Sequence, residues 1–128
     1  MTAAERRLEV SASNVANALS SGPLPDASPA IQASYPPAYV AQRVDQVEAP
    51  GGGTIATVGH ENPGTVPVYD PSAPYANGKG LVATPNVDFA NEAIQQLMAK
   101  ISFQSNAFVV RTYDQMMKTL LDIGSPRR

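Results

Sequence analysis

The sequence predicts an α+β fold in which an N-terminal helix and a long C-terminal helix flank a small, irregular central region that contains a β-hairpin. Glycine and proline oppose helix interiors. In this chain of 128 residues, all of them lie between Gly22 and Pro85 except for Gly124 and Pro126. All three phenylalanines lie in the last third of the chain. The chain therefore divides into an N-terminal helix at 1–21, a Pro/Gly-rich β and loop region at 22–85, and a C-terminal helix at 86–128.

The first helix is expected to cover residues 2 to about 20. Gly22 and Pro23 supply its stop signal. Side chains at a spacing of three and four predict one packing face, formed by Met1, Ala4, Leu8, Ser11, Val15 and Ala18. Because this face is built mainly from small side chains and the helix is short, we expect it to pack closely against another helix and to be marginal alone.

The long helix is expected to begin near Asn86, as its N-cap, with Asp88 in the first turn, and to end before Gly124. It would span roughly 55 Å at 1.5 Å per residue. Two apolar seams follow the alternating spacing of helices that pack along their length. The first seam comprises Ala90, Ile94, Leu97, Ile101, Ser105 and Phe108, and the second comprises Phe103, Ala107, Val110, Asp114, Met117 and Leu121.

The central region is expected to be extended chain with turns. Residues 39–47 alternate in part between apolar and polar side chains, and residues 54–58 are rich in β-branched side chains. Three consecutive glycines at 51–53 separate these two runs, which predicts one hairpin or two. The flanking stretches at 22–32 and 60–74 are punctuated by proline and are expected to be partly mobile loops.

Composition excludes several classes of function. The formal net charge of −2 argues against a nucleic-acid binder, which would present a basic face. Without cysteine, the chain has neither disulfides nor thiolate metal sites. No apolar run reaches the length of a membrane span, so no membrane insertion is expected. The first ten residues lack the apolar stretch of a cleaved secretory signal.

No pattern predicts catalysis, a cofactor or a metal site. His60 stands near Glu61 and Asp70, but no second ligand occurs at a metal-binding spacing, and we expect His60 to be a solvated loop residue. The glycine-rich stretches at 51–53 and 78–80 lack the phosphate-loop pattern. No serine is set in a nucleophile elbow. The sequence therefore does not predict an enzyme.

The large apolar side chains predict assembly with other chains. Burying one such side chain stabilises by about 1.5–3 kcal/mol, yet the short first helix can cover only part of the long one. We expect the two helices to form an inter-subunit coiled-coil layer and to gain order on association. The predicted subunit-interface residues are Leu8, Asn14, Val15, Asn17, Ile94, Leu97, Ile101, Phe103, Phe108, Val110, Met117 and Leu121.

Three features of these helices have two interpretations each. Asn14 and Asn17 are poor helix formers in mid-helix; we favour hydrogen bonds that fix the register with neighbouring helices over exposure on a fraying helix. Asp114 interrupts the second seam, and rotation of that seam toward solvent is favoured over a pair with a basic group of a neighbour. Phe103 and Phe108 are interpreted as anchors in an inter-chain groove rather than as intrachain core.

Several motifs resemble flagellar axial proteins. Residues 11–17, SASNVAN, are similar to the motif in the N-terminal helix of rod and hook proteins. Tyr69-Asp70-Pro71, Pro74, Gly80, Val82 and the stretch PNVD at 85–88 resemble the proximal rod protein (FlgC) family of basal-body rod proteins, as does MMKTLLDIG at 116–124. Leu81 stands where that family usually has tyrosine. Family members usually begin several helical turns before Met1, so we expect either further helical sequence upstream or a shortened first helix with a weaker grip.

The resemblance implies a structural subunit of the proximal rod that polymerises through its terminal helices and helps to transmit torque from motor to hook. It implies other rod subunits, copies of the chain itself and basal-body ring components as partners. It also implies a periplasmic location reached through the flagellar type III apparatus, without a cleaved signal peptide. The alternatives are another flagellar axial protein, or a secreted helical adaptor that docks one partner in a defined small complex.

Overall fold

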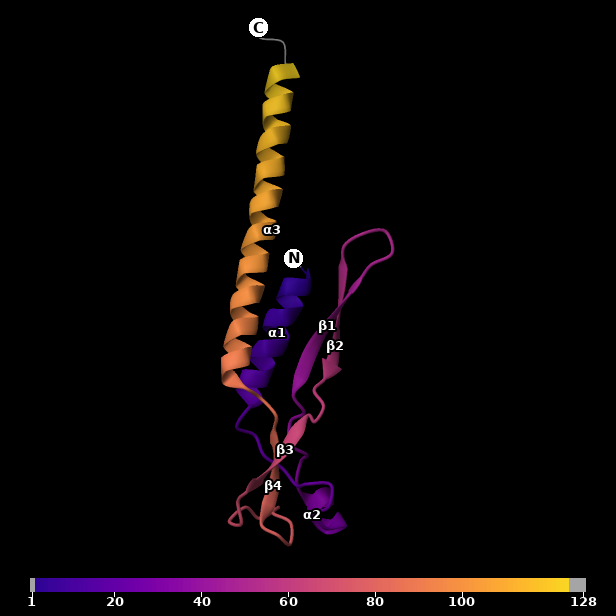
Figure 1. Cartoon of the computed structure of the whole chain (residues 1–128), viewed down its shortest axis with the longest axis vertical. Helices are drawn as coiled ribbons and strands as arrows, with labels where there is room; N and C mark the ends of the chain where they lie inside the picture. Colours follow the sequence, from indigo (N-terminus) through magenta and orange to yellow (C-terminus); the bar gives the residue numbers. More distant parts are fainter. Residues whose placement is uncertain (1, 125–128) are drawn as a thin grey trace.

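The computed structural model describes residues 2–124 and confirms the predicted α+β fold with two terminal helices. Helix α3 is the longest element, and helix α1 lies beside its lower half (Figure 1). One β-hairpin packs on the other side of α1, and a second strand pair lies below the helices together with a short helix (Figure 1). The elements in chain order are α1 (Thr2–Asn17), α2 (Pro29–Ser34), β1 (Gln42–Glu48), β2 (Thr54–His60), β3 (Thr65–Tyr69), β4 (Leu81–Pro85) and α3 (Phe89–Gly124).

Helix α1 ends at Asn17, earlier than predicted, because the chain turns away to meet β4. The N–H of Gly22 donates to the carbonyl of Ala83 at 3.0 Å, and the N–H of Ala83 donates back at 2.9 Å. A Cβ at Gly22 would lie 2.4 Å from the backbone nitrogen of Ala38, so only glycine fits this crossing. The stop signal predicted at Gly22 therefore reflects close backbone packing.

Helix α3 begins three residues after the predicted N-cap. The side chain of Asp88 caps the helix, since its Oδ1 accepts from the N–H groups of Ala90 at 2.9 Å and Asn91 at 3.4 Å. The prediction that Asn86 caps this helix was wrong: its amide instead donates to the carbonyl of Pro63 at 2.9 Å and fastens the approach to the helix. From Phe89 to Gly124 the helix is 36 residues long, about 54 Å.

The predicted hairpin around the three glycines is present. Strands β1 and β2 are antiparallel, with Gln42 opposite His60 and Glu48 opposite Thr54. Gly51, Gly52 and Gly53 all have positive φ, a conformation that other residues rarely adopt. His60 is exposed as predicted, but it ends β2 rather than lying in a loop.

Two stretches that were predicted as loops contain regular structure. Strand β3 lies within 60–74 and pairs antiparallel with β4, with Pro67 tolerated because β3 is an edge strand of this pair. Helix α2 lies within 22–32 and beyond, with Pro29 in its first turn. Its N-cap is Ser28, whose hydroxyl accepts from the N–H of Ile31 at 3.4 Å. Proline in these stretches marks the start of a helix and the edge of a sheet.

The buried apolar core is built from small side chains. It contains no leucine, isoleucine, methionine or aromatic residue among residues 2–124. One part lies between α1, α3 and the start of β1, and the other surrounds β4. Its members are Ala4, Val10, Ala27, Ala38, Ala41, Val82, Ala83 and Ala99. Most of the large apolar side chains in the described part of the chain are therefore exposed, and others, such as Leu24, Ile31 and Leu81, are half-buried.

Candidate subunit interface

Small side chains make the contact between α1 and α3. Ala4 and Ser11 on α1 and Ala99 on α3 are buried, and the hydroxyl of Ser11 donates to the backbone carbonyl of Glu92 at 3.1 Å. The predicted face of α1 is thus divided. Ala4 and Ser11 pack inside the chain and Ala18 is half-buried, whereas Leu8 and Val15 border this contact and remain exposed. Met1, also predicted for this face, lies outside the described residues. Close approach of the two helices leaves the larger side chains on the outside.

The second seam of α3 continues the side of the helix that α1 covers. At about 100° per residue, Phe103, Val110 and Met117 follow the direction of Ala99. The start of α1 lies beside Ser102 and Asn106. Beyond that level α3 projects past α1, and Figure 1 shows no other described element beside it. We call residues 107–124 the projecting segment, which is about 27 Å long.

The first seam occupies the opposite side of α3. Ile94, Ile101 and Phe108 point away from α1 by the same helical arithmetic, whereas Leu97 lies at the border of this side and also lines the groove between α3 and α1. All ten apolar residues of the predicted interface are at least 37% exposed. These ten are Leu8, Val15, Ile94, Leu97, Ile101, Phe103, Phe108, Val110, Met117 and Leu121. A single copy of the chain therefore leaves both seams largely uncovered.

An apolar groove runs between α1 and α3. Its volume is about 720 Å³, and only residues of these two helices line it. Ala4 and Ala99 are the buried residues of the lining, and Leu8, Leu97 and Phe103 are its exposed large apolar members. The groove brings together predicted interface residues that lie far apart in the sequence, including Leu8 of α1 and Phe103 of α3. Its apolar lining between two helices suits a third helix.

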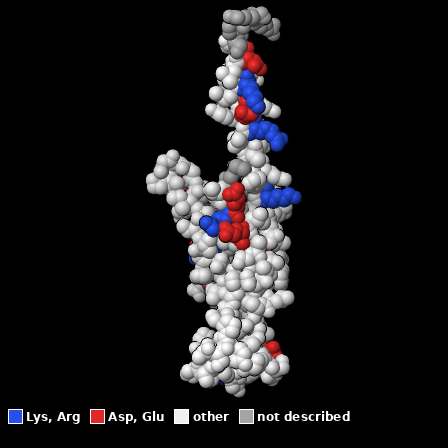
Figure 2. All heavy atoms as spheres, turned by 180° about the vertical axis from the view of Figure 1, so that it is seen from behind, with Lys and Arg blue, Asp and Glu red and all other residues white. Residues whose placement is uncertain are grey.

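Charged residues of the projecting segment keep to one side. Figure 2 shows them as a row along α3, with uncharged atoms around it. Lys118 Nζ lies 2.8 Å from Asp114 Oδ2, and both side chains are more than 60% exposed. Asp114 thus pairs within its own helix, which agrees with the favoured exposure to solvent. Away from the row, Val109, Tyr113 and Met116 extend the second seam into a broad apolar surface.

The two asparagines of α1 lie in different surroundings. Asn14 is only 2% exposed, and its amide is bonded to Gln42 and Glu92 of the same chain. Asn14 does bond to a neighbouring helix, but that helix is α3 of the same chain, and the place of Asn14 in the subunit interface stays a prediction. Asn17 donates to the carbonyl of Ser13 at 2.8 Å at the end of α1. Sequence reasoning recognised both residues but had no signal for the strand that Asn14 contacts.

Other site types find little support in residues 2–124. The described part of the chain holds no group of three or more potential metal-ligating side chains. None of the described helices has the length and apolar content that crossing a membrane requires. The largest features of the surface are thus the two exposed seams and the groove between the helices.

Comparison with known proteins gives one consistent result. Residues 79–123, which include β4 and nearly all of α3, match the family described as flagellar basal body rod FlgEFG protein C-terminal. The flagellar basal-body rod protein FlgC of Salmonella typhimurium is 36% identical over 126 residues, covering 97% of this chain and 90% of that protein. FlgC of Yersinia enterocolitica is 35% identical with the same coverage. FlgC of Buchnera aphidicola subsp. Schizaphis graminum is 39% identical over 57 residues, 44% of this chain and 42% of its own.

Proposed function

The chain belongs to the FlgC family of flagellar basal-body rod proteins and is a structural subunit of the rod, and from that premise we propose that it polymerises through the exposed faces of α1 and α3. The exposed seams carry this proposal. Burying a single leucine, isoleucine, phenylalanine or methionine contributes about 1.5–3 kcal/mol. Several of these side chains would be buried together if helices of other subunits covered both seams.

The projecting segment and the groove have complementary properties. The segment is an amphipathic helix with one continuous, exposed apolar face, which is typical of a helix that packs against other helices. Members of this face include Val109, Val110, Tyr113, Met116, Met117 and Leu120. The groove offers a lining for a helix at the lower level of the same molecule. A long helix that packs against other subunits along its length would also transmit torque from one subunit to the next. Transmission of torque from motor to hook requires such a connection.

The partners follow from this mode of packing. The chain is part of the flagellar basal body, and we propose other rod subunits and further copies of the chain as neighbours along the seams. Basal-body ring components would meet the outer surface formed by the hairpins. Within this proposal the chain acts by packing, without a catalytic group, a cofactor or nucleic acid.

We further propose a periplasmic position, reached in an unfolded state through the flagellar type III apparatus without cleavage of a signal peptide. The small core supports this route, because a core built mainly from alanine and valine costs little to unfold. With no cysteine, no disulfide has to be broken or formed on the way. Assembly would then supply the burial that the single chain lacks.

Two substitutions test the proposal in cells of the source bacterium. Leu97→Asp and Phe108→Asp each place a carboxylate in the first seam, where burial without a partner is strongly unfavourable. We expect loss of rod assembly and of swimming, with the central strands intact by circular dichroism. The matched control is Arg111→Asp, which places the same carboxylate in the exposed charged row. Normal swimming with either seam variant would refute the assignment, and a small complex of fixed size in place of rods would favour an adaptor.

A further inference from the structure

The side chain of Asn14 connects three separate parts of the fold. Its Nδ2 donates to the carbonyl of Gln42 and to Oε1 of Glu92, both at 2.7 Å. Its Oδ1 accepts from the N–H of Gln42 at 2.9 Å and from the hydroxyl of Tyr39 at 3.0 Å. A primary amide has two donor hydrogens and two acceptor lone pairs, so these four bonds satisfy it completely.

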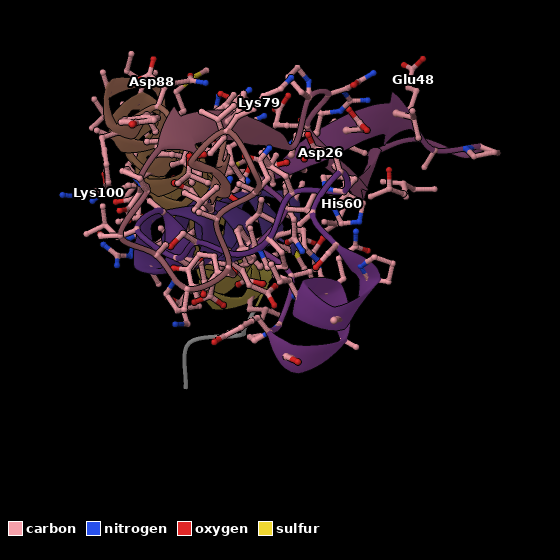
Figure 3. All side chains as sticks on the ribbon, turned by 90° about the horizontal axis from the view of Figure 1, so that it is seen from below. Asp26, Glu48, His60, Lys79, Asp88 and Lys100 are labelled. Carbon is pink, nitrogen blue, oxygen red and sulfur yellow. The ribbon has the colours of Figure 1, made fainter. Side chains whose placement is uncertain are left out.

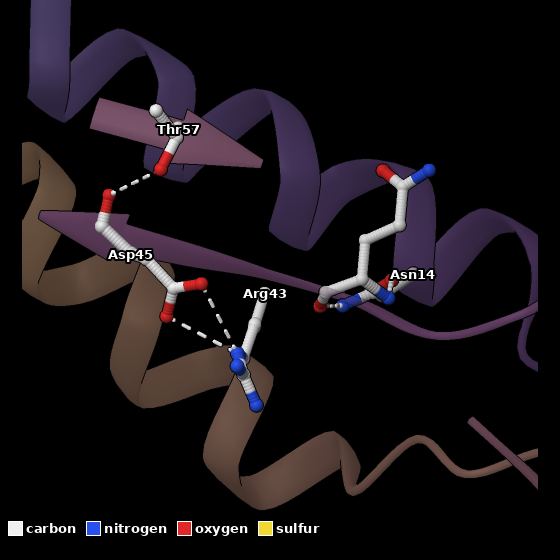
Figure 4. A network of polar contacts seen from close by, with 5 residues as sticks. Asn14, Arg43, Asp45 and Thr57 are labelled. Carbon is white, nitrogen blue, oxygen red and sulfur yellow. Dashed lines mark hydrogen bonds and ion pairs between the residues drawn. The ribbon is translucent and has the colours of Figure 1, made fainter. Parts of the chain in front are cut away.

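At β1, the amide of Asn14 takes the place of a neighbouring strand. Both backbone groups of Gln42 point to Asn14, and therefore away from β2, which pairs with the other edge of β1. Figure 4 shows Asn14 at the start of β1, well apart from the Arg43–Asp45 pair on the exposed side of the hairpin. Asn14 thus holds the hairpin at its base.

At α3, two residues of α1 bind the same glutamate. The amide of Asn14 binds the carboxylate of Glu92, and the hydroxyl of Ser11 binds its backbone carbonyl. Glu92 is only 9% exposed, so its carboxylate depends on such partners. The strand, the first helix and the long helix therefore meet at one buried polar cluster, formed by Asn14, Gln42 and Glu92.

We propose that Asn14 is a positioning residue that holds the β1–β2 hairpin at one fixed angle to the α1–α3 pair. Both strands of the hairpin also lie against α1, but most of their side chains are exposed, so the buried polar cluster is the specific connection between hairpin and helices. The joint works within one copy of the chain and goes beyond the proposed assembly. In a polymer it would give every hairpin the same orientation, so that the outer surface repeats as regularly as the helix layer.

The chemistry of the joint requires an amide. Aspartate at position 14 would have no hydrogen to donate, and two acceptors, the carbonyl of Gln42 and the carboxylate of Glu92, would face its oxygens. An apolar replacement would leave both of these acceptors and the N–H of Gln42 without partners in a buried place. Either change frees the hairpin from the helices while the pairing of β1 with β2 remains.

Distance measurements between two spin labels test the joint. The chain contains no cysteine, so Glu48→Cys on the hairpin and Lys100→Cys on α3 give one defined pair. Figure 3 places these exposed residues on opposite sides of the molecule. In dilute full-length chain we expect one narrow distance peak. Asn14→Asp should abolish that narrow peak, whereas Asn17→Asp, three residues along the same helix, should retain it because Asn17 binds only within α1.

Two further variants decide the outcome if Asn14→Asp fails to fold. Glu92→Ala removes only the α3 side of the joint and should broaden the peak without adding charge. Adding Glu92→Gln to Asn14→Asp removes the clash of carboxylates and should restore part of the narrow peak. A narrow peak that survives both Asn14→Asp and Glu92→Ala, or a broad peak in the unmodified background, would overturn the proposal. Because the measurement uses single chains, a failure of assembly alone would leave this result unchanged.

Discussion

Lys118 and Asp114 form an ion pair of 2.8 Å one turn apart on the projecting segment of α3. The pair shows which side of this helix stays in water. The other charged residues of the segment, Arg111 and Asp122, stand on the same side by helical spacing. Gln115, Thr112 and Thr119 extend the polar side, and the opposite side, with Tyr113, Met116 and Leu120, is apolar and exposed in the single chain. An amphipathic helix of this kind is expected to pack through its apolar face and to turn its charged side to solvent.

Neutralising the charged row should have little effect. Asp114→Asn removes an exposed i,i+4 pair, which contributes no more than about 0.5 kcal/mol. We expect the thermal midpoint to change little and swimming to remain normal. The comparison variant is Met117→Asp, which adds a carboxylate to the apolar second seam of the same helix. We expect it to abolish assembly. Immotile cells carrying Asp114→Asn would show that the row lies in an interface after all.

The close contact of α1 with α3 should not tolerate a larger side chain. Ala99 is 2% exposed and faces the small residues of α1, so Ala99→Leu must push the helices apart. We expect a loss of about 1–3 kcal/mol in unfolding free energy, as overpacking usually costs, measured by urea denaturation. Ala93→Leu introduces the same side chain at an exposed position of α3 and should be nearly neutral. Equal stability of the two variants would contradict the packing described here.

The crossing at Gly22 should be equally restrictive. Gly22→Ala places a Cβ against the backbone of Ala38 and of the prolines before it, none of which can move without disturbing the link to β4. We expect a clear fall in the thermal midpoint. Gly78→Ala is the matched control, because a Cβ there meets nothing within 4 Å. If Gly22→Ala melts at the temperature of Gly78→Ala, the backbone contact is looser than the structure indicates.

Amide hydrogen exchange should divide α3 into two parts. Residues 89–103 pack on α1, whereas the projecting segment has no described element beside it in the single chain. In dilute protein we expect the projecting segment to exchange quickly and the packed part more slowly. Uniform strong protection along the whole helix would show that a single chain already stabilises α3. That result would contradict the claim that the projecting segment needs neighbouring subunits.

The sequence was sufficient for the helices and the first hairpin because their signals are local. The long run without glycine or proline predicts α3, and the three glycines predict the turn between β1 and β2. The alternation of Val66 and Val68 in β3 was hidden by Pro67, since proline in a strand normally indicates a break. In the same way the prolines around Ser28-Pro29 predict a loop, although serine followed by proline is also the start signal of a helix.

Which face of α1 turns inward could not be decided by hydrophobicity. The spacing rule placed Ala4, Leu8, Ser11 and Val15 on one face, yet of these the structure buries only Ala4 and Ser11. It also buries Val10 and Asn14, and it leaves Leu8 and Val15 exposed. The reason is that α1 packs by close approach and by hydrogen bonds, and partners such as Gln42 and Glu92 are distant in sequence. The sequence also predicts the apolar seams of α3, which the described part of the chain leaves exposed. The helices that we propose to cover them belong to other subunits.

The accessibility of one seam residue tests the central claim most directly. Val110→Cys adds a thiol of similar size to the second seam of the cysteine-free chain, at a position that is 60% exposed in the single copy. A water-soluble maleimide should modify it readily in dilute monomer and very slowly in purified rods. Equal rates of modification in monomer and rods would show that the seam stays open to solvent and would contradict assembly through these helices.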